Sequence, residues 1–261
     1  MFDLAALDRE LTGSIFAGQL HFSSVVESTN SEALAAARQA APHGSVFFAD
    51  EQTAGRGRGD HAWQSAAGKG LYVSVLLRPV FSSRLLPLLP LAVGLAAAEA
   101  IHAASGLTAD LRWPNDLLLG TRKVCGLLVE AKTEGTSVAY AVAGIGINVH
   151  HSAFAPDLAT AATSLDMESG RRVSRQALLV SLLKSLEREA LALGISEAAE
   201  TLPRRVAAAS TWISGRKVEV HGPQACRGVT DGLDCNGFLR VKTPQGLVIV
   251  QTGGIRADEI E

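Results

Sequence analysis

The chain has 261 residues, of which 47% are hydrophobic and 19% charged, which is a globular composition with room for one large domain and a small second one. A net charge of −2 and a pI near 6.4 exclude binding to nucleic acid or anionic membranes through overall charge, so any basic site must be local. Cys125, Cys226 and Cys235 lack metal-ligand spacing and the first residues lack a signal-peptide pattern, which predicts a cytoplasmic protein with reduced thiols.

The first half of the chain predicts a sheet with helices packed on it. A helix is expected over 4–11, followed by a strand over 20–27, and a polar turn of Ser28, Thr29 and Asn30 can then cap an alanine-rich helix over 31–41. Further strands are expected over 45–49, 71–77, 111–113, 117–119, 123–130 and 138–149. The apolar stretch 85–98 contains Pro87 and Pro90, so we expect the helix over 90–104 to be buried in a core and not to span a membrane.

In the second half of the chain, the spacing of hydrophobic residues changes near Trp212. Helical spacing covers 175–193 and 196–209, and short strands separated by glycines follow at 217–220, 227–233, 238–242 and 247–251. This predicts two domains, residues 1–211 and residues 212–261, the second a small β-barrel.

The segment 51–63 reads Glu-Gln-Thr-Ala-Gly-Arg-Gly-Arg-Gly-Asp-His-Ala-Trp. Its glycines allow close approach of the main chain to a ligand, and Arg56 and Arg58 are forked cationic donors suited to phosphate or carboxylate oxygens. The same composition would suit a disordered Arg-Gly segment that binds nucleic acid, but the overall charge of the chain argues against that alternative.

Three other polar clusters follow strands or lie between them: Ser28 to Asn30, the block from Arg112 to Asp116 with Lys123, and the run from Gly144 to Asn148. Polar groups gathered on an apolar scaffold are typical of small-molecule sites. The phosphate-binding loop and the dinucleotide fingerprint both fail on spacing, so a nucleotide would have to bind by another scheme.

Taken in order, these clusters resemble the biotin protein ligases, which make biotinyl-5′-adenylate from biotin and ATP and transfer biotin to a lysine of an acceptor protein. The resemblance is carried by Ser-Thr-Asn at 28–30, Gln-x-x-Gly-Arg-Gly-Arg at 52–58 with Trp63, Trp-Pro-Asn-Asp at 113–116, Lys-Val-Cys-Gly-Leu-Leu-Val-Glu at 123–130 and Gly-Ile-Gly-Ile-Asn-Val at 144–149. It implies an α+β fold: a mixed β-sheet packed with helices, of the class II aminoacyl-tRNA synthetase-like type of the biotin and lipoate ligases, followed by a small SH3-like β-barrel.

The resemblance also implies a role for each matching residue. Lys123, Arg56 and Arg58 would be catalytic, and biotin would be bound by Ser28, Thr29, Asn30, Gln52, Gly55, Arg56, Trp63, Lys123 and Gly126. ATP and the adenylate would contact Arg58, Asn115, Asp116, Gly144, Gly146, Asn148 and Arg256, and Asp116 would also help to bind Mg²⁺.

This reading expects biotin, ATP and Mg²⁺ as ligands and a biotin carboxyl carrier protein as acceptor, with no nucleic acid, no membrane and a possible homodimer. No operator binding is expected, because no helix-turn-helix precedes the first strand. Asp60 departs from the basic continuation that the family's loop commonly has, and Arg112 stands where lysine is frequent. The competing hypotheses are a lipoate or octanoyl transferase and a non-catalytic module that binds biotin or its adenylate.

Overall fold

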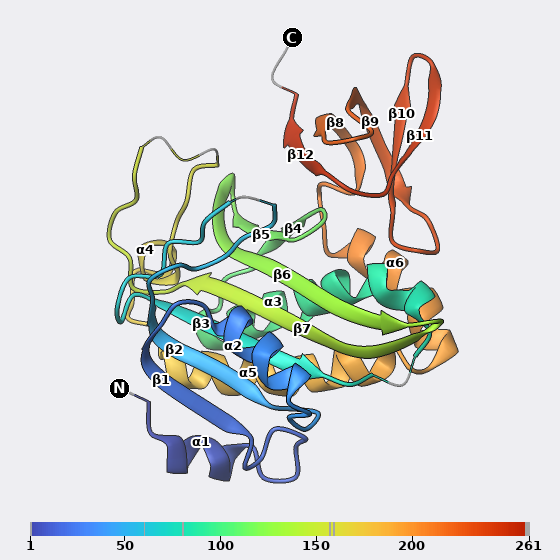
Figure 1. Cartoon of the computed structure of the whole chain (residues 1–261). Helices are drawn as coiled ribbons and strands as arrows, with labels where there is room; N and C mark the ends of the chain where they lie inside the picture. Colours follow the sequence, from blue (N-terminus) through green and yellow to red (C-terminus); the bar gives the residue numbers. More distant parts are fainter. Residues whose placement is uncertain (1, 60, 80, 157, 159, 259–261) are drawn as a thin grey trace.

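The computed structural model describes residues 2–59, 61–79, 81–156, 158 and 160–258. It consists of a large sheet flanked by helices and a smaller lobe at the C-terminal end of the chain (Figure 1). Asp60, the residue that departs from the loop pattern of the biotin protein ligases, lies outside the described residues.

The large sheet has seven strands in the order β1-β2-β3-β7-β6-β5-β4. The strands are β1 (Leu20–Val26), β2 (Val46–Gln52), β3 (Gly70–Leu77), β4 (Asp110–Arg112), β5 (Asp116–Leu119), β6 (Arg122–Glu134) and β7 (Ser137–Asn148). Among the described strand pairs of this sheet only β1–β2 is parallel, and it is joined by α2 (Thr29–Arg38), as parallel neighbours require a crossover. The predicted mixed sheet is therefore confirmed.

Helices cover both faces of this sheet, and α2 covers one of them. Ala33 and Ala37 of α2 pack on Leu76, Tyr140 and Val142, which belong to β3 and β7. Side chains alternate along a strand, so the intervening residues of β3 and β7 face the opposite layer. The face under α2 is the one that carries the polar residues discussed below.

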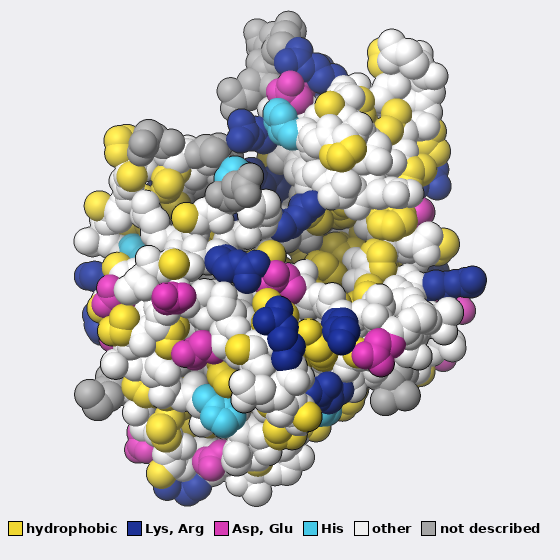
Figure 2. Space-filling view, viewed as in Figure 1, with side chains coloured by type: hydrophobic (Ala, Val, Ile, Leu, Met, Phe, Trp, Pro, Cys, Tyr) yellow, Lys and Arg dark blue, Asp and Glu magenta, His cyan; other side chains and the backbone are white. Residues whose placement is uncertain are grey.

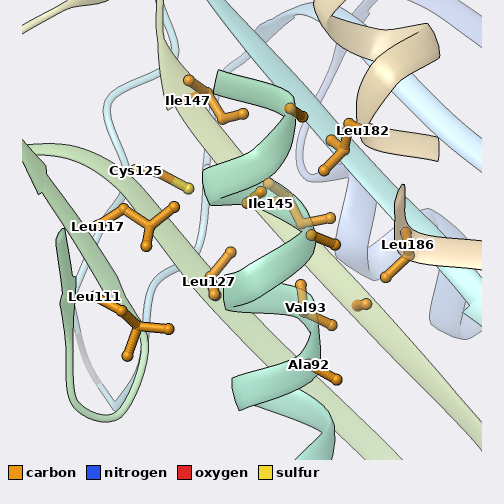
Figure 3. Close-up of a cluster of buried hydrophobic side chains, with 14 of the residues drawn as sticks. Ala92, Val93, Leu111, Leu117, Cys125, Leu127, Ile145, Ile147, Leu182 and Leu186 are labelled. Carbon is orange, nitrogen blue, oxygen red and sulfur yellow. The ribbon is translucent and has the colours of Figure 1, made fainter. Parts of the chain in front are cut away.

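The opposite face packs on α3 (Leu89–Ser105) and α5 (Arg175–Ala192), which also pack on each other: α3 contacts β6 and β7, and α5 contacts β3. Figure 3 shows side chains from these helices and from the sheet meeting in one apolar layer, Val93, Leu127, Ile145 and Leu186 among them. Together with the preceding 3-10 helix η1 (Ser83–Leu88), α3 is long and apolar enough by composition to cross a membrane, and more than half of its most apolar stretch is buried in this core.

The smaller lobe follows α6 (Ser196–Ala208) and contains β8 (Ser214–His221), β9 (Cys226–Leu233), β10 (Leu239–Thr243), β11 (Gly246–Val250) and β12 (Gly254–Ala257). These form an antiparallel sheet in the order β11-β10-β9-β8-β12. The pairings of the described residues leave the sheet open, so the predicted C-terminal strands are confirmed and an SH3-like barrel is not.

Several element boundaries differ from the sequence prediction. Helix α1 (Leu4–Glu10) is as expected, but α2 begins at Thr29 because Ser28 is its N-cap, accepting from the Ser31 N–H at 3.4 Å. Thr29 and Asn30 therefore belong to the first helical turn. The short helix α4 (Leu165–Ser169) and strand β12 were not predicted.

Candidate active site

A cavity of about 600 Å³ lies between the α2 face of the large sheet and the C-terminal lobe. Its walls come from the start of α2, residues 56–59 and 61–64, the β4–β5 turn, β6, β7, the residues Phe154, Leu158, Thr160 and Ala162, and two turns of the C-terminal lobe near Gly222 and Gly253. Figure 2 shows Lys and Arg side chains gathered where the main body and this lobe meet. We call residues 53–65, apart from residue 60, the glycine–arginine loop.

Polar side chains from α2, β2 and the glycine–arginine loop line one end of the cavity. Gln52 Oε1 accepts from the Thr29 N–H at 2.9 Å and lies 3.1 Å from Thr29 Oγ1. Gln52 Nε2 donates to Ser65 Oγ at 2.7 Å, and Ser65 Oγ donates to the Trp63 carbonyl at 3.2 Å. The end of β2 is thus bonded to the first turn of α2 and to the end of the loop.

A second run of contacts leads from Thr29 to β6. Thr29 Oγ1 lies 2.8 Å from Ser74 Oγ, and Ser74 Oγ lies 2.9 Å from Asn30 Oδ1. Asn30 Nδ2 donates to Glu130 Oε2 at 2.6 Å. Ser74 and Glu130 were not predicted as site residues, although Ser74 is the one polar residue of the strand Leu71 to Leu77 and is fully buried.

The glycine–arginine loop folds back on itself as a short hairpin. The Trp63 N–H donates to the Gly55 carbonyl at 2.8 Å, and the Gly57 N–H donates to the His61 carbonyl at 2.7 Å. A Cβ atom at Gly55 would come within 2.8 Å of Ser65 Oγ and would also clash with the Trp63 carbonyl. Glycine is required there by this close approach of two chain segments.

The two loop arginines bond to different parts of the protein. Arg56 Nη2 donates to Glu130 Oε1 of β6 at 2.7 Å. Arg58 donates to the Gly253 carbonyl at 2.6 Å and to Thr252 Oγ1 at 3.0 Å, both in the C-terminal lobe. Burial lowers the pKa of the Arg58 guanidinium, and the charge of Asp116 partly opposes this shift.

Lys123 lies beside Asp116 at the centre of the cavity wall. Its Nζ is 2.6 Å from Asp116 Oδ1, and Arg112 Nη2 is 2.6 Å from Asp116 Oδ2. The Lys123 Nζ also lies 5.3 Å from the centre of the Trp63 ring, a distance suited to a cation–π contact. Two cations therefore pair with a single carboxylate, which leaves net positive charge in this part of the cavity.

Three glycines make the cavity floor flat on the α2 face of the sheet. Gly126 of β6 and Gly146 of β7 are directly opposed, and the Trp63 ring lies over both, since a Cβ would come within 2.8 Å of Trp63 Cζ3 at Gly126 and 2.5 Å of Cε2 at Gly146. Gly144 likewise leaves space for Asn30. Trp63 Nε1 is buried and has no hydrogen-bond partner among the described residues.

The remaining predicted residues also reach the cavity, with one exception. Asn115, Asn148 and Arg256 line it, but Asn115 Nδ2 is already bonded to the Leu127 carbonyl at 2.8 Å and Asn148 Nδ2 to the Thr163 carbonyl at 3.1 Å. Gly55 supports the loop and is not among the described lining residues. Lining residues that sequence reasoning missed include Ser74, Phe154, Thr160, Ala162, His221, Gly222 and Gly253.

Comparison with known proteins supports one family. Residues 22–148 match the sequence model of the "Biotin/lipoate A/B protein ligase family". The chain is 32% identical over 236 residues to a "Biotin--[acetyl-CoA-carboxylase] ligase" of Paracoccus denitrificans, covering 86% of this chain and 94% of that protein. It is 36% identical over 180 residues to a "Bifunctional ligase/repressor BirA" of Bacillus spizizenii, covering 68% of this chain and 55% of that protein.

The matched region thus spans about half the length of the Bacillus relative. Among solved structures, a biotin protein ligase from Aquifex aeolicus in complex with biotin and ATP superposes with a TM-score of 0.78 at 27% identity, covering 91% of this chain and 97% of that one. The Paracoccus protein is matched over nearly its whole length, and the fold agrees as well. The chain therefore belongs to the biotin protein ligase family.

Proposed function

We propose that this protein joins biotin to a lysine of a carboxylase carrier domain by way of biotinyl-5′-AMP. The observation that carries the proposal is the convergence of Lys123, Arg56 and Arg58 on one cavity whose other end is lined by the Thr29–Gln52 hydrogen bonds. The cations suit a carboxylate and a phosphate, and the polar end suits a ring with N–H and C=O groups. The names of the relatives supply the identity of the ring and of the acceptor.

In the first half-reaction a biotin carboxylate oxygen attacks the α-phosphorus of ATP, an acyl–phosphate bond forms and pyrophosphate leaves. Both reactants are anions, so the chain has to neutralise charge and hold the two in line. Lys123 is placed to do this because its ammonium group is held by Asp116 and not left free to turn. Arg58 would add charge from the loop side, where its burial strengthens the interaction.

In the second half-reaction the neutral amine of an acceptor lysine attacks the acyl carbon, an amide forms and AMP leaves. We assign no base to this step. Asp116 is the only carboxylate among the described lining residues, and it is paired with Arg112 and Lys123. The loop arginines would instead keep water from the anhydride until the acceptor binds.

Asp116 does not fit the role of a magnesium ligand that the sequence suggested. Each of its two oxygens lies 2.6 Å from a cationic nitrogen, one on Arg112 and one on Lys123. The described residues contain no group of three or more His, Cys, Asp or Glu side chains able to hold a metal. We therefore assign Asp116 to positioning Lys123, and a requirement for Mg²⁺ would have to arise from the nucleotide phosphates.

We further infer that residues 212–261 act as a separate small domain of SH3-like type. Support comes from the antiparallel β8–β12 sheet, which shares no described strand with the seven-stranded sheet. Two bonds join it to the catalytic part: Arg58 to the Gly253 carbonyl, and Trp113 Nε1 to the Gly237 carbonyl at 3.1 Å. A cytoplasmic location, a homodimer and a lack of nucleic-acid binding stay predictions.

Mass spectrometry of a carrier domain incubated with the protein, biotin, ATP and Mg²⁺ tests the proposed function. A biotinyl adduct on one lysine is expected, and it should be absent without ATP and with Lys123→Ala. Lys132→Ala is the matched control, because Lys132 lies on the same strand and pairs only with exposed Glu134 among the described residues. Transfer of lipoate or octanoate in place of biotin would refute the assignment of substrate, and binding of biotin with no transfer would refute the enzyme.

A further inference from the structure

The polar end of the cavity contains more hydrogen-bond acceptors than protons to share among them. Three oxygen–oxygen contacts run in series: Gln52 Oε1 to Thr29 Oγ1 at 3.1 Å, Thr29 Oγ1 to Ser74 Oγ at 2.8 Å, and Ser74 Oγ to Asn30 Oδ1 at 2.9 Å. The hydroxyls of Thr29 and Ser74 have one proton each. Whether the series is short of protons depends on which way the two terminal amides face.

The Gln52 amide is fixed by partners at both of its ends. Its oxygen accepts from the Thr29 N–H at 2.9 Å, and its nitrogen donates to Ser65 Oγ at 2.7 Å. Turning the amide over would place its NH₂ group against the Thr29 N–H, so two donors would face each other. The Gln52 end of the series is therefore an acceptor.

The Asn30 amide is fixed by Glu130. The Glu130 carboxylate only accepts, and it lies 2.6 Å from Asn30 Nδ2 and 2.7 Å from the Arg56 guanidinium. Turning the Asn30 amide would bring its oxygen against a carboxylate oxygen. The Asn30 end of the series is therefore an acceptor too, and two hydroxyl protons serve three contacts.

Little solvent reaches these groups to supply the missing proton. Ser74 is fully buried, and Thr29 and Asn30 are each 4% exposed. Thr29, Asn30 and Ser74 all line the cavity, whereas Glu130 is not among its described lining residues. A ligand that points N–H donors at these oxygens would satisfy acceptor capacity that the protein leaves unfilled, and a ligand that points an acceptor at the same oxygens would meet lone pairs.

We propose that Glu130 sets the hydrogen-bond polarity of this end of the cavity, and so its specificity, without touching the ligand. The Glu130 carboxylate orients the Asn30 amide so that its oxygen accepts from Ser74. The Thr29 and Ser74 hydroxyls then have more lone pairs than protons to offer a ligand, so the pocket selects a ring that carries N–H groups. Glu130 is on this account a positioning residue. The inference rests on the proposed function for its choice of ligand, a cyclic urea.

Glu130→Gln should reverse this polarity with almost no change of shape. Arg56 would fix the new amide with its oxygen toward the guanidinium and its NH₂ group toward Asn30. Asn30 would then turn, donate to Ser74 and complete the series: Asn30 to Ser74, Ser74 to Thr29, Thr29 to Gln52. All three contacts would have a proton with no ligand present, so the demand for ligand N–H groups would disappear.

The test compares the binding of biotin with that of an analogue in which oxygen replaces one ring N–H, giving a cyclic carbamate of the same shape. Isothermal titration of the wild-type protein should show the carbamate binding at least about tenfold more weakly, since sites built for a substrate N–H strongly reject its isostere. In Glu130→Gln the ratio of the two affinities should fall at least about threefold toward equality, with biotin as the ligand that loses affinity.

Two control variants separate polarity from other effects. Glu134→Gln removes a carboxylate from the same strand, where it pairs with Lys132, and should leave the ratio unchanged. Glu99→Gln removes a carboxylate from α3, on the opposite face of the sheet, where it pairs with Arg188, and should also leave the ratio unchanged.

Two results would overturn the inference: equal binding of biotin and carbamate by the wild-type protein, which needs no variant, or an unchanged ratio in folded Glu130→Gln. A wild-type protein that binds no biotin would instead overturn the proposed function.

Discussion

Replacing Gly146 by alanine should push the Trp63 ring off the floor of the cavity. The added Cβ would lie 2.5 Å from Trp63 Cε2 and 3.0 Å from Cζ2. Carbon atoms settle at about 3.5–4.0 Å, so the ring has to move by about 1 Å. The backbone of Gly146 is extended within β7 and accepts alanine without strain, so the clash with the ring is the main effect.

The expected cost falls more on catalysis than on stability. Overpacking typically costs about 1–3 kcal/mol, and we expect about 1 kcal/mol in unfolding free energy here, because Trp63 is on a loop that can yield. A misplacement of about 1 Å in a reacting site can cost about 100-fold in rate, so adenylate formation should fall by about that factor. Lys123 contributes to this loss, since its ammonium group contacts the same ring.

Single-turnover synthesis of biotinyl-adenylate and tryptophan fluorescence measure the two effects. The emission should shift to the red, because Trp113 and Trp212 do not contact Gly146 and stay buried, whereas the half-buried Trp63 would gain solvent. Gly126→Ala should act in the same direction but less, with its Cβ 2.8 Å from Trp63 Cζ3, and Gly194→Ala is the control, with its Cβ an ordinary 3.4 Å from the Leu191 carbonyl. Wild-type rates and emission in Gly146→Ala would refute the placement of Trp63.

Three further predictions concern Arg58, His43 and the cysteines. Arg58→Lys keeps the charge but cannot fork between Gly253 and Thr252, so preformed biotinyl-adenylate should dissociate about tenfold faster in a release assay. His43 accepts from the Arg78 N–H at 3.0 Å, and burial lowers the pKa of its imidazole. As the pH falls through about 6.5, the unfolded chain therefore takes up a proton at this histidine before the folded protein does. Urea unfolding should show a lower unfolding free energy at about pH 5.5 than at about pH 7.5, and His43→Asn should lose less of it. Under native conditions iodoacetamide should label exposed Cys235 and spare Cys125, whose thiol is buried with a raised pKa.

Each of these has an outcome that contradicts it. Unchanged adenylate release in Arg58→Lys would mean that the bonds to the C-terminal lobe do not hold the loop closed. Equal pH sensitivity of wild-type protein and His43→Asn would show that His43 is not the group that resists protonation. Labelling of Cys125 as fast as Cys235, read by peptide mass mapping, would place that thiol outside the core.

The sequence predicted those parts of the site whose residue types are set by local chemistry. The Ser-Thr-Asn turn, the glycine–arginine loop and Lys123 stood out as polar clusters, and their roles came from the resemblance to the biotin protein ligases. The series from Thr29 through Ser74 to Glu130 could not be predicted, since it joins residues up to 100 positions apart and depends on which strands become neighbours. Strand β12 was missed because four residues that include a glycine carry little periodicity and are held only by pairing with β8 among the described strands.

The bond from Arg58 to Gly253 ties the cavity on the large sheet to a lobe whose few buried side chains are joined to the main core. Small units with few buried side chains open at lower free energies than the core that they are attached to. On warming, the lobe should therefore unfold locally and activity should be lost while the seven-stranded sheet is still intact. The durability of this protein is then measured by the half-life of its activity at a given temperature, and its melting point overstates it.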